Sequence, residues 1–206
     1  MIKLMGETNI LANLLYCIVV IPFTCEIDFI LTLWLKNVPP YTVQFCICIF
    51  IMNFISLNNN ILNIGVQAIG KIRNYSLASG TCSILVIPIS WFLLKAGLSL
   101  VWAFIIPIFT SLLIYIISTI NLSLYIKNFN PFEYFARTFL KTLLVCIPCI
   151  VFMIYIRMQL PASYSRALIS IISIFLLFLS LSFIFLLNKK MKIKLLNKLK
   201  LKFNLG

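Results

Sequence analysis

The sequence predicts an all-α fold: a polytopic membrane helix bundle with about six transmembrane helices. Apolar residues make up 63% of the chain and charged residues only 10%, against roughly 45–50% and 25% in ordinary soluble domains. Long apolar stretches also recur along the whole chain, separated by short polar segments. Too few polar groups exist to cover a soluble globule of this size, so we expect the apolar stretches to cross a membrane.

Each predicted span is an apolar run bounded by proline, charged or amide residues. The spans are expected at about 9–24, 41–70, 75–94, 100–124, 138–156 and 167–187. Residues 1–188 then form the bundle, and a short interfacial segment at 25–36 places Trp34 at headgroup level. In residues 189–206 lysine alternates with apolar residues, which is typical of a basic amphipathic helix on the inner leaflet.

The net charge of +13 comes from cations at the ends of the apolar runs. With the C-terminal tail inside, six alternating spans place on the inner side Lys3, Lys71, Arg73, Lys127, Arg137, Lys141 and seven tail lysines. Only four cations fall on the outer side: Lys36, Lys95, Arg157 and Arg166. Because cytoplasmic loops carry the excess of Lys and Arg, both termini are predicted to be cytoplasmic. This distribution favours membrane lipids as partners, and no nucleic acid is expected.

The residue types needed for catalysis are scarce. The chain has no histidine, and it shows no glycine-rich phosphate loop, metal-ligand cluster or nucleophile triad. We therefore expect no enzyme, no catalytic residue, no metal site and no cofactor. The cysteines, including the pair Cys146 and Cys149, lie mostly within apolar runs and are read as small buried hydrophobic residues. Glu26 and Asp28 are expected in a solvated external loop, with a cation or proton site near the outer vestibule as the alternative.

The second span contains several amide side chains, and some of them fall on a single face. At about 100° per residue, four amides share that face: Asn53, Asn60, Asn63 and Gln67. Such a stripe can bind sugar hydroxyls or line a wet path, and equally it can join helices without any ligand. The triple asparagine at 58–60 is too polar for lipid and is expected to face other helices or a water-filled cavity.

Lys71 and Arg73 follow the amide stripe at the predicted inner surface. Cations at that position can meet a phosphate group. They can also serve only as markers of the cytoplasmic membrane boundary.

Three segments resemble a known family: LWLKNVPPYT, GVQAIGKIRNYSLASG and VIPISWFLLKAG. They are similar to the second half of bacterial polysaccharide flippases, the O-antigen-unit translocases of the multidrug/oligosaccharidyl-lipid/polysaccharide exporter superfamily. The similarity covers about residues 29–97 and is compositional from residue 100 onwards. It rests on Trp34, Pro39, Gln67, Ala68, Gly70, Lys71, Pro88, Ser90, Trp91, Lys95 and Gly97. The chain departs from the family where Leu100 stands in place of a proline, and where Asn121 and Lys127 stand without the arginine expected after the fourth span.

The resemblance implies a fold and a function. Family members have about twelve to fourteen spans in two halves, so six spans resemble the C-terminal half of a truncated or split member, with a separate N-terminal half as partner. The implied substrate is an undecaprenyl-pyrophosphate-linked oligosaccharide, moved across the bacterial inner membrane by alternating access around a hydrophilic cavity. The amide stripe then contacts sugar, and Lys71 and Arg73 attract pyrophosphate. The alternatives are a multidrug or small-molecule antiporter of the same superfamily, and a non-transporting truncated membrane protein.

Overall fold

The computed structural model describes residues 1–127, 129–160 and 163–185, and the regular structure in these ranges is helical. Six helical segments among them are long and apolar enough to cross a membrane. This confirms the predicted fold class, a bundle of about six membrane-spanning helices. The predicted basic helix at 189–206 lies outside the described residues.

The helices match the predicted spans to within a few residues, with two differences. They are α1 (Ile2–Cys25), α2 (Ile27–Leu35), α3 (Thr42–Ala68), α4 (Ile72–Lys95), α5 (Trp102–Tyr125), α6 (Pro131–Phe135), the π-helical turn η1 (Ala136–Leu140), α7 (Lys141–Gln159) and α8 (Tyr164–Phe185). First, α1 begins seven residues before the predicted start of its span. Second, α6, η1 and α7 follow one another without a break, so the fifth spanning segment begins at Pro131 instead of residue 138.

Local sequence signals explain where these helices begin and end. The chain turns after α3 at Gly70 and after α4 at Gly97, where φ is 74° and 85°. Glycine takes this left-handed conformation without steric penalty, which is why it commonly ends helices. At the start of α6 the Asn130 side chain accepts hydrogen bonds from two backbone amides, and Pro131 occupies the first helical position. Both are favoured N-terminal signals.

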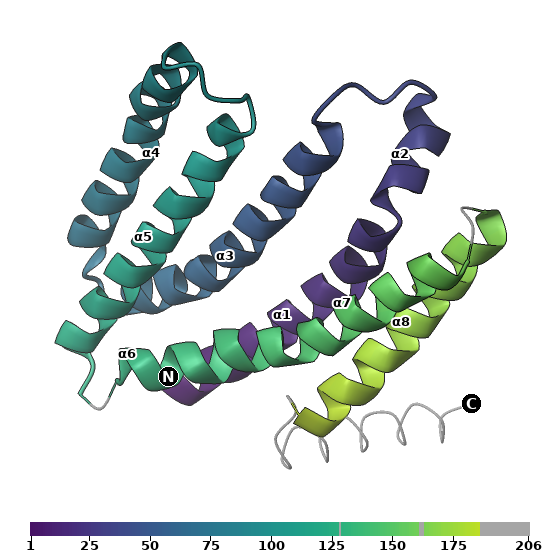
Figure 1. The fold of residues 1–206 in the computed structure, drawn as a ribbon. Helices are drawn as coiled ribbons and strands as arrows, with labels where there is room; N and C mark the ends of the chain where they lie inside the picture. Colours follow the sequence, from purple (N-terminus) through teal and green to yellow (C-terminus); the bar gives the residue numbers. More distant parts are fainter. Residues whose placement is uncertain (128, 161–162, 186–206) are drawn as a thin grey trace.

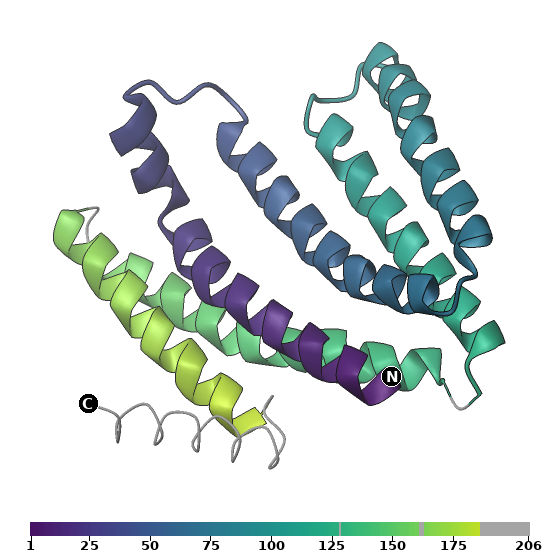
Figure 2. The ribbon, with the colours of Figure 1, turned by 180° about the vertical axis from the view of Figure 1, so that it is seen from behind.

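The helices form two packed groups that meet at α1 and α3 (Figure 1). One group contains α1, α7 and α8, and the other contains α3, α4 and α5, with α5 packed against both α3 and α4. Figure 2 shows the same arrangement from behind: α1 and α3 lie close where α1 begins and α3 ends, and they spread apart toward the loop between α2 and α3.

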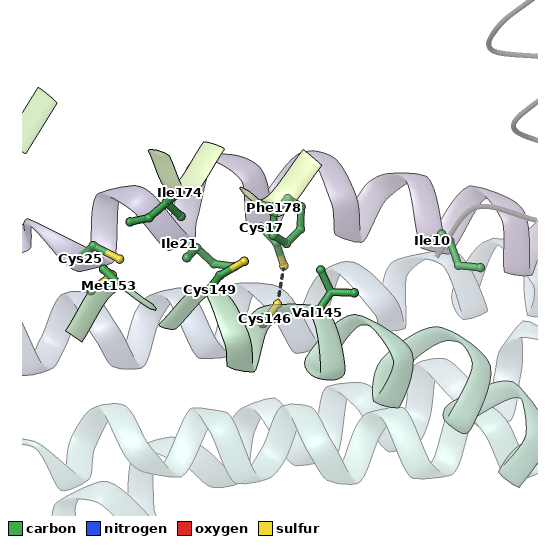
Figure 3. Close-up of a cluster of buried hydrophobic side chains, with 10 residues drawn as sticks. All are labelled: Ile10, Cys17, Ile21, Cys25, Val145, Cys146, Cys149, Met153, Ile174 and Phe178. Atoms are coloured by element: carbon green, nitrogen blue, oxygen red, sulfur yellow. Dashed lines mark hydrogen bonds between the residues drawn. The ribbon is translucent and has the colours of Figure 1, made fainter. Parts of the chain in front are cut away.

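The core of the first group lies where α1, α7 and α8 meet (Figure 3). Ile174 and Phe178 of α8 pack there against cysteine, isoleucine and valine side chains of α1 and α7. The Cys146 thiol donates a hydrogen bond to the Cys17 sulfur at 3.7 Å, and all seven cysteines are free thiols. Of these, Cys17, Cys25, Cys146 and Cys149 are buried, as expected of cysteines that act as small hydrophobic residues.

Candidate functional site

Helix α3 uses two of its amides to join neighbouring helices. The Asn58 side chain is fully buried and exchanges hydrogen bonds with Asn13 of α1, at 3.0 Å in each direction. The next residue, Asn59, accepts a hydrogen bond from the Ser118 hydroxyl of α5 at 2.7 Å. These two amides therefore face other helices, as expected, and they connect α3 to each of its main neighbours.

The four amides of the predicted stripe lie on the other side of α3. Asn53, Asn60 and Gln67 are exposed and Asn63 is half-buried. Their side chains form no hydrogen bond with any described residue, and Oδ1 of Asn63 is enclosed without a partner. The packed face of the helix carries Asn58 and Leu62, which point about 160–200° away from Asn60 at 100° per residue.

Burial therefore divides the amides of α3 into two sets. Asn58 and Asn59 are buried and join α3 to its neighbours, whereas Asn60, the third member of the triple asparagine, belongs to the open face. Ser56, three residues after Asn53 and four before Asn60, shares this face and is half-buried. Ser56 was not among the predicted residues, although its spacing in the stripe would have identified it.

The open face of α3 is chemically unsuited to lipid tails. Moving a primary amide from water into hydrocarbon without a hydrogen-bond partner costs a transfer free energy of roughly 2–7 kcal/mol, depending on the reference state. Polar groups in spans accordingly face a water-filled cavity, a polar ligand or another polar helix. The open face can supply amide donors and acceptors to any of these.

Lys71 and Arg73 lie beyond the end of α3, in the turn to α4. Because Gly70 redirects the chain, they do not continue the stripe along one helix axis. The Lys71 ammonium lies 5.9 Å from the centre of the Tyr125 ring, and Arg73 is exposed in the first turn of α4. Neither cation forms an ion pair with a described residue. Two free cations at a helix N-terminus suit an anionic group.

The expectation of a solvated loop at Glu26 is wrong. Glu26 sits at the junction of α1 and α2 with 1% of its surface exposed. Its carboxylate accepts hydrogen bonds from Arg166 at 2.8 Å and from the Ser170 hydroxyl at 3.1 Å. A buried carboxylate requires such partners because water no longer solvates it. Asp28 is exposed as expected, but it lies in helix α2 and pairs with Arg157 at 2.9 Å.

An apolar groove runs between α1, α3 and α7, on a different side of α3 from the stripe. Its volume is about 480 Å³, and its walls include Phe50, Phe54 and Ile55 of α3 and Leu143 and Ile150 of α7. The lining is almost wholly apolar, which fits a hydrocarbon chain and excludes a phosphate or a sugar. Within the described ranges there is also no group of three or more His, Cys, Asp or Glu placed to hold a metal ion.

No protein-family model, no curated protein and no solved structure matches this chain. The class of the protein therefore rests on the fold and on the six apolar segments. It is a helical, multi-pass membrane protein.

Proposed function

We propose that the chain is the C-terminal half of a transporter that moves an undecaprenyl-pyrophosphate-linked oligosaccharide, an O-antigen or capsule unit, across the bacterial inner membrane. One observation carries the proposal: the exposed face of a membrane-spanning helix presents four amides that packing does not use. Such a face is suited to a hydrophilic cavity, completed by a separate N-terminal half and rocking between two openings. In this arrangement both termini are cytoplasmic.

The amides of α3 match the substrate's sugar portion. Each amide offers two donors and one acceptor, and sugar hydroxyls can use both. Asn53 and Gln67 lie fourteen residues apart, or about 21 Å along the helix axis. A stripe of this length can contact successive sugars as the unit passes along α3.

The cations at the turn after α3 match the other end of the substrate. Lys71 and Arg73 have no acidic partner among the described residues, so both charges are available to a pyrophosphate. Their place at the end of a span puts them at a membrane surface, where the pyrophosphate of a lipid-linked sugar resides. We assign this surface to the cytoplasmic side, where the substrate enters.

Complementation tests the assignment of the stripe. In the source strain with this gene deleted, we expect the wild-type gene to restore surface polysaccharide. A variant with Asn60→Ala, Asn63→Ala and Gln67→Ala should restore at least about tenfold less, because three hydrogen bonds at about 0.5–1.5 kcal/mol each are lost. The matched control is Ile64→Ala, since Ile64 is an exposed apolar residue on the same helix.

Four outcomes separate the possibilities. Full export by the triple alanine variant at normal protein level contradicts the stripe as a sugar site. Normal surface polysaccharide in the deletion strain contradicts the flippase function itself, and loss of drug resistance there instead would indicate the antiporter. Accumulation of lipid-linked units in a Lys71→Gln, Arg73→Gln variant, with Lys95→Gln as control, supports pyrophosphate capture.

A further inference from the structure

A charged cavity lies at the membrane surface where α1 begins. Its volume is about 420 Å³, and its lining combines the first two turns of α1 with α6 and η1. Four charged side chains line it: Lys3, Glu7, Glu133 and Arg137. Although two are basic and two acidic, none forms an ion pair with a described residue. Both signs of charge therefore face one cavity without neutralising each other in close pairs.

Two hydrogen bonds fix the register of α1 against the helix that begins with α6 and continues through η1. Asn9 of α1 donates to the Tyr134 hydroxyl, and further along the same pair of helices Asn13 donates to the Thr138 carbonyl. The two helices therefore run parallel in a nearly constant register. Since α1 runs from this surface into the membrane, higher residue numbers on both helices lie closer to the hydrocarbon.

The charges are layered along this direction. Glu7 lies two residues before Asn9, and Glu133 lies one before Tyr134, so the carboxylates lie at about the same level. Arg137 lies four residues after Glu133, just over one helical turn or roughly 6 Å deeper. Arg137 is therefore the inner charge of the cavity, the two carboxylates lie above it, and Lys3, four residues before Glu7, is the outermost charge.

This order matches the headgroup of an aminophospholipid. In such a lipid the phosphate adjoins the glycerol and the ammonium extends outward toward water. We propose that the cavity binds the headgroup of a zwitterionic phospholipid with a primary ammonium, the phosphate on Arg137 and the ammonium on Glu7 and Glu133. The guanidinium favours phosphate, and a primary ammonium donates three hydrogen bonds that carboxylates accept.

Exposed apolar side chains beside the cavity favour a lipid as the occupant. Leu4 is 69% exposed and Phe132 is 79% exposed, and each adjoins a charged lining residue in sequence. Large apolar groups next to charges are typical of the boundary between headgroups and hydrocarbon. An anionic lipid such as phosphatidylglycerol fits less well, because its headgroup offers the two carboxylates only neutral hydroxyl donors and no cation. This inference does not depend on the transport function.

Lipid retention measured by native mass spectrometry tests the proposal. The purified full chain in detergent is titrated with dioleoyl phosphatidylethanolamine, phosphatidylglycerol or phosphatidylcholine. We expect about tenfold tighter retention of phosphatidylethanolamine than of phosphatidylglycerol, which corresponds to a charge-assisted hydrogen bond. Phosphatidylcholine, whose quaternary ammonium donates no hydrogen bond, should be retained more weakly than phosphatidylethanolamine.

Variants assign the preference to this cavity. Glu7→Gln with Glu133→Gln should remove the preference for phosphatidylethanolamine over phosphatidylglycerol, whereas Arg137→Gln should weaken retention of both lipids. Asp28→Asn changes an exposed acid in α2 and is the control that should leave the preference intact. If the variant with both Glu7→Gln and Glu133→Gln still prefers phosphatidylethanolamine over phosphatidylglycerol, the proposal is overturned.

Two further outcomes also decide the proposal. Equal retention of the three lipids by the wild-type chain overturns it without any variant, so a variant that fails to fold does not affect this test. Free phosphoethanolamine separates a lipid from a soluble ligand of the same chemistry. If it displaces bound phosphatidylethanolamine at equal concentration, the cavity is a site for a soluble phosphoamine, and the lipid assignment is wrong.

Discussion

Asn13 of α1 and Asn58 of α3 exchange two hydrogen bonds through their side-chain amides, each 3.0 Å long. Both side chains are fully buried. The Asn13 amide nitrogen also lies 3.3 Å from the carbonyl oxygen of Thr138, in the π-helical turn that leads into α7. This amide pair therefore connects the two helix groups at the point where α1, α3 and η1 meet.

Replacing one member of this pair should destabilise the bundle. Asn58→Ala leaves the Asn13 amide partly unpaired in an apolar setting, and we expect the free energy of unfolding to fall by about 1–2 kcal/mol. SDS-induced unfolding in mixed micelles, followed by circular dichroism, measures the change. The matched control is Asn60→Ala, which removes an exposed amide two residues away and should change stability by less than about 0.5 kcal/mol.

The double variant tests whether the two amides act as a pair. Asn13→Leu with Asn58→Leu replaces both partners by apolar groups of similar size, so that neither amide is left without the other. The double variant should lose less free energy of unfolding than Asn13→Leu and Asn58→Leu lose in total. The difference should be about 0.5–3 kcal/mol, the usual coupling of residues in contact. Strictly additive effects would contradict a reciprocal pair.

The two ion pairs at the junction of α1 and α2 should differ strongly in their effect on stability. Arg166→Met leaves the Glu26 carboxylate buried with only the Ser170 hydroxyl as partner, and we expect a loss of about 3–5 kcal/mol. Arg157→Met breaks the exposed pair with Asp28 and should change stability by about 1 kcal/mol or less. The same unfolding assay compares them, and equal losses would show that Glu26 is solvated.

Gly65 marks a close approach of α3 to α1 and α5. A Cβ atom at this position would lie 2.5 Å from Cε of Met5 and 3.5 Å from Cδ2 of Leu122. Gly65→Leu should therefore lower the free energy of unfolding by about 1–3 kcal/mol, because the added side chain overpacks this contact. The control, Gly80→Leu on α4, has nothing within 4 Å of its Cβ and should not destabilise.

A second substitution shows which contact is responsible. The atoms nearest to the added Cβ are at the flexible end of Met5, so Met5→Ala in the Gly65→Leu background should recover part of the lost stability. Gly65→Ala should change stability by no more than about 1 kcal/mol, because the higher helix propensity of alanine offsets the displacement of Met5. A large loss in Gly65→Ala would mean that Met5 cannot move.

The fold was predictable because it depends on properties that the sequence shows locally. Apolar length fixes the number of spans, and residues such as Gly70 and Asn130 mark helix ends within a few positions. The 100° spacing also identified the amides of α3 that share the open face. That Asn58 and Asn59 bond to α1 and α5, while Asn60 does not, depends on the placement of neighbouring helices and could not be read from spacing.

The burial of Glu26 was not predictable for the same reason. Its partner Arg166 is 140 residues away, and hydropathy says nothing about which cation approaches which acid. The predicted topology did place Glu26, Asp28, Arg157 and Arg166 on the same membrane side, and the structure brings these four residues together in two ion pairs. The topology was therefore informative about the pairing, but the choice between a solvated loop and a buried pair required the three-dimensional structure.

The orientation in the membrane gives a last prediction. Lys36 and Lys95 lie at one end of the spans, and Arg73 and Lys127 lie at the other end. The excess of cations predicts that the second pair is cytoplasmic. Single cysteines at these positions, with the partly exposed Cys46, Cys48 and Cys82 changed to serine, should therefore react with a membrane-impermeant maleimide in intact spheroplasts only at positions 36 and 95. Positions 73 and 127 should react after lysis.

The reverse labelling pattern would show that the protein has the opposite orientation, with Lys71 and Arg73 away from the cytoplasmic substrate. Labelling of all four positions in intact spheroplasts would contradict six alternating spans.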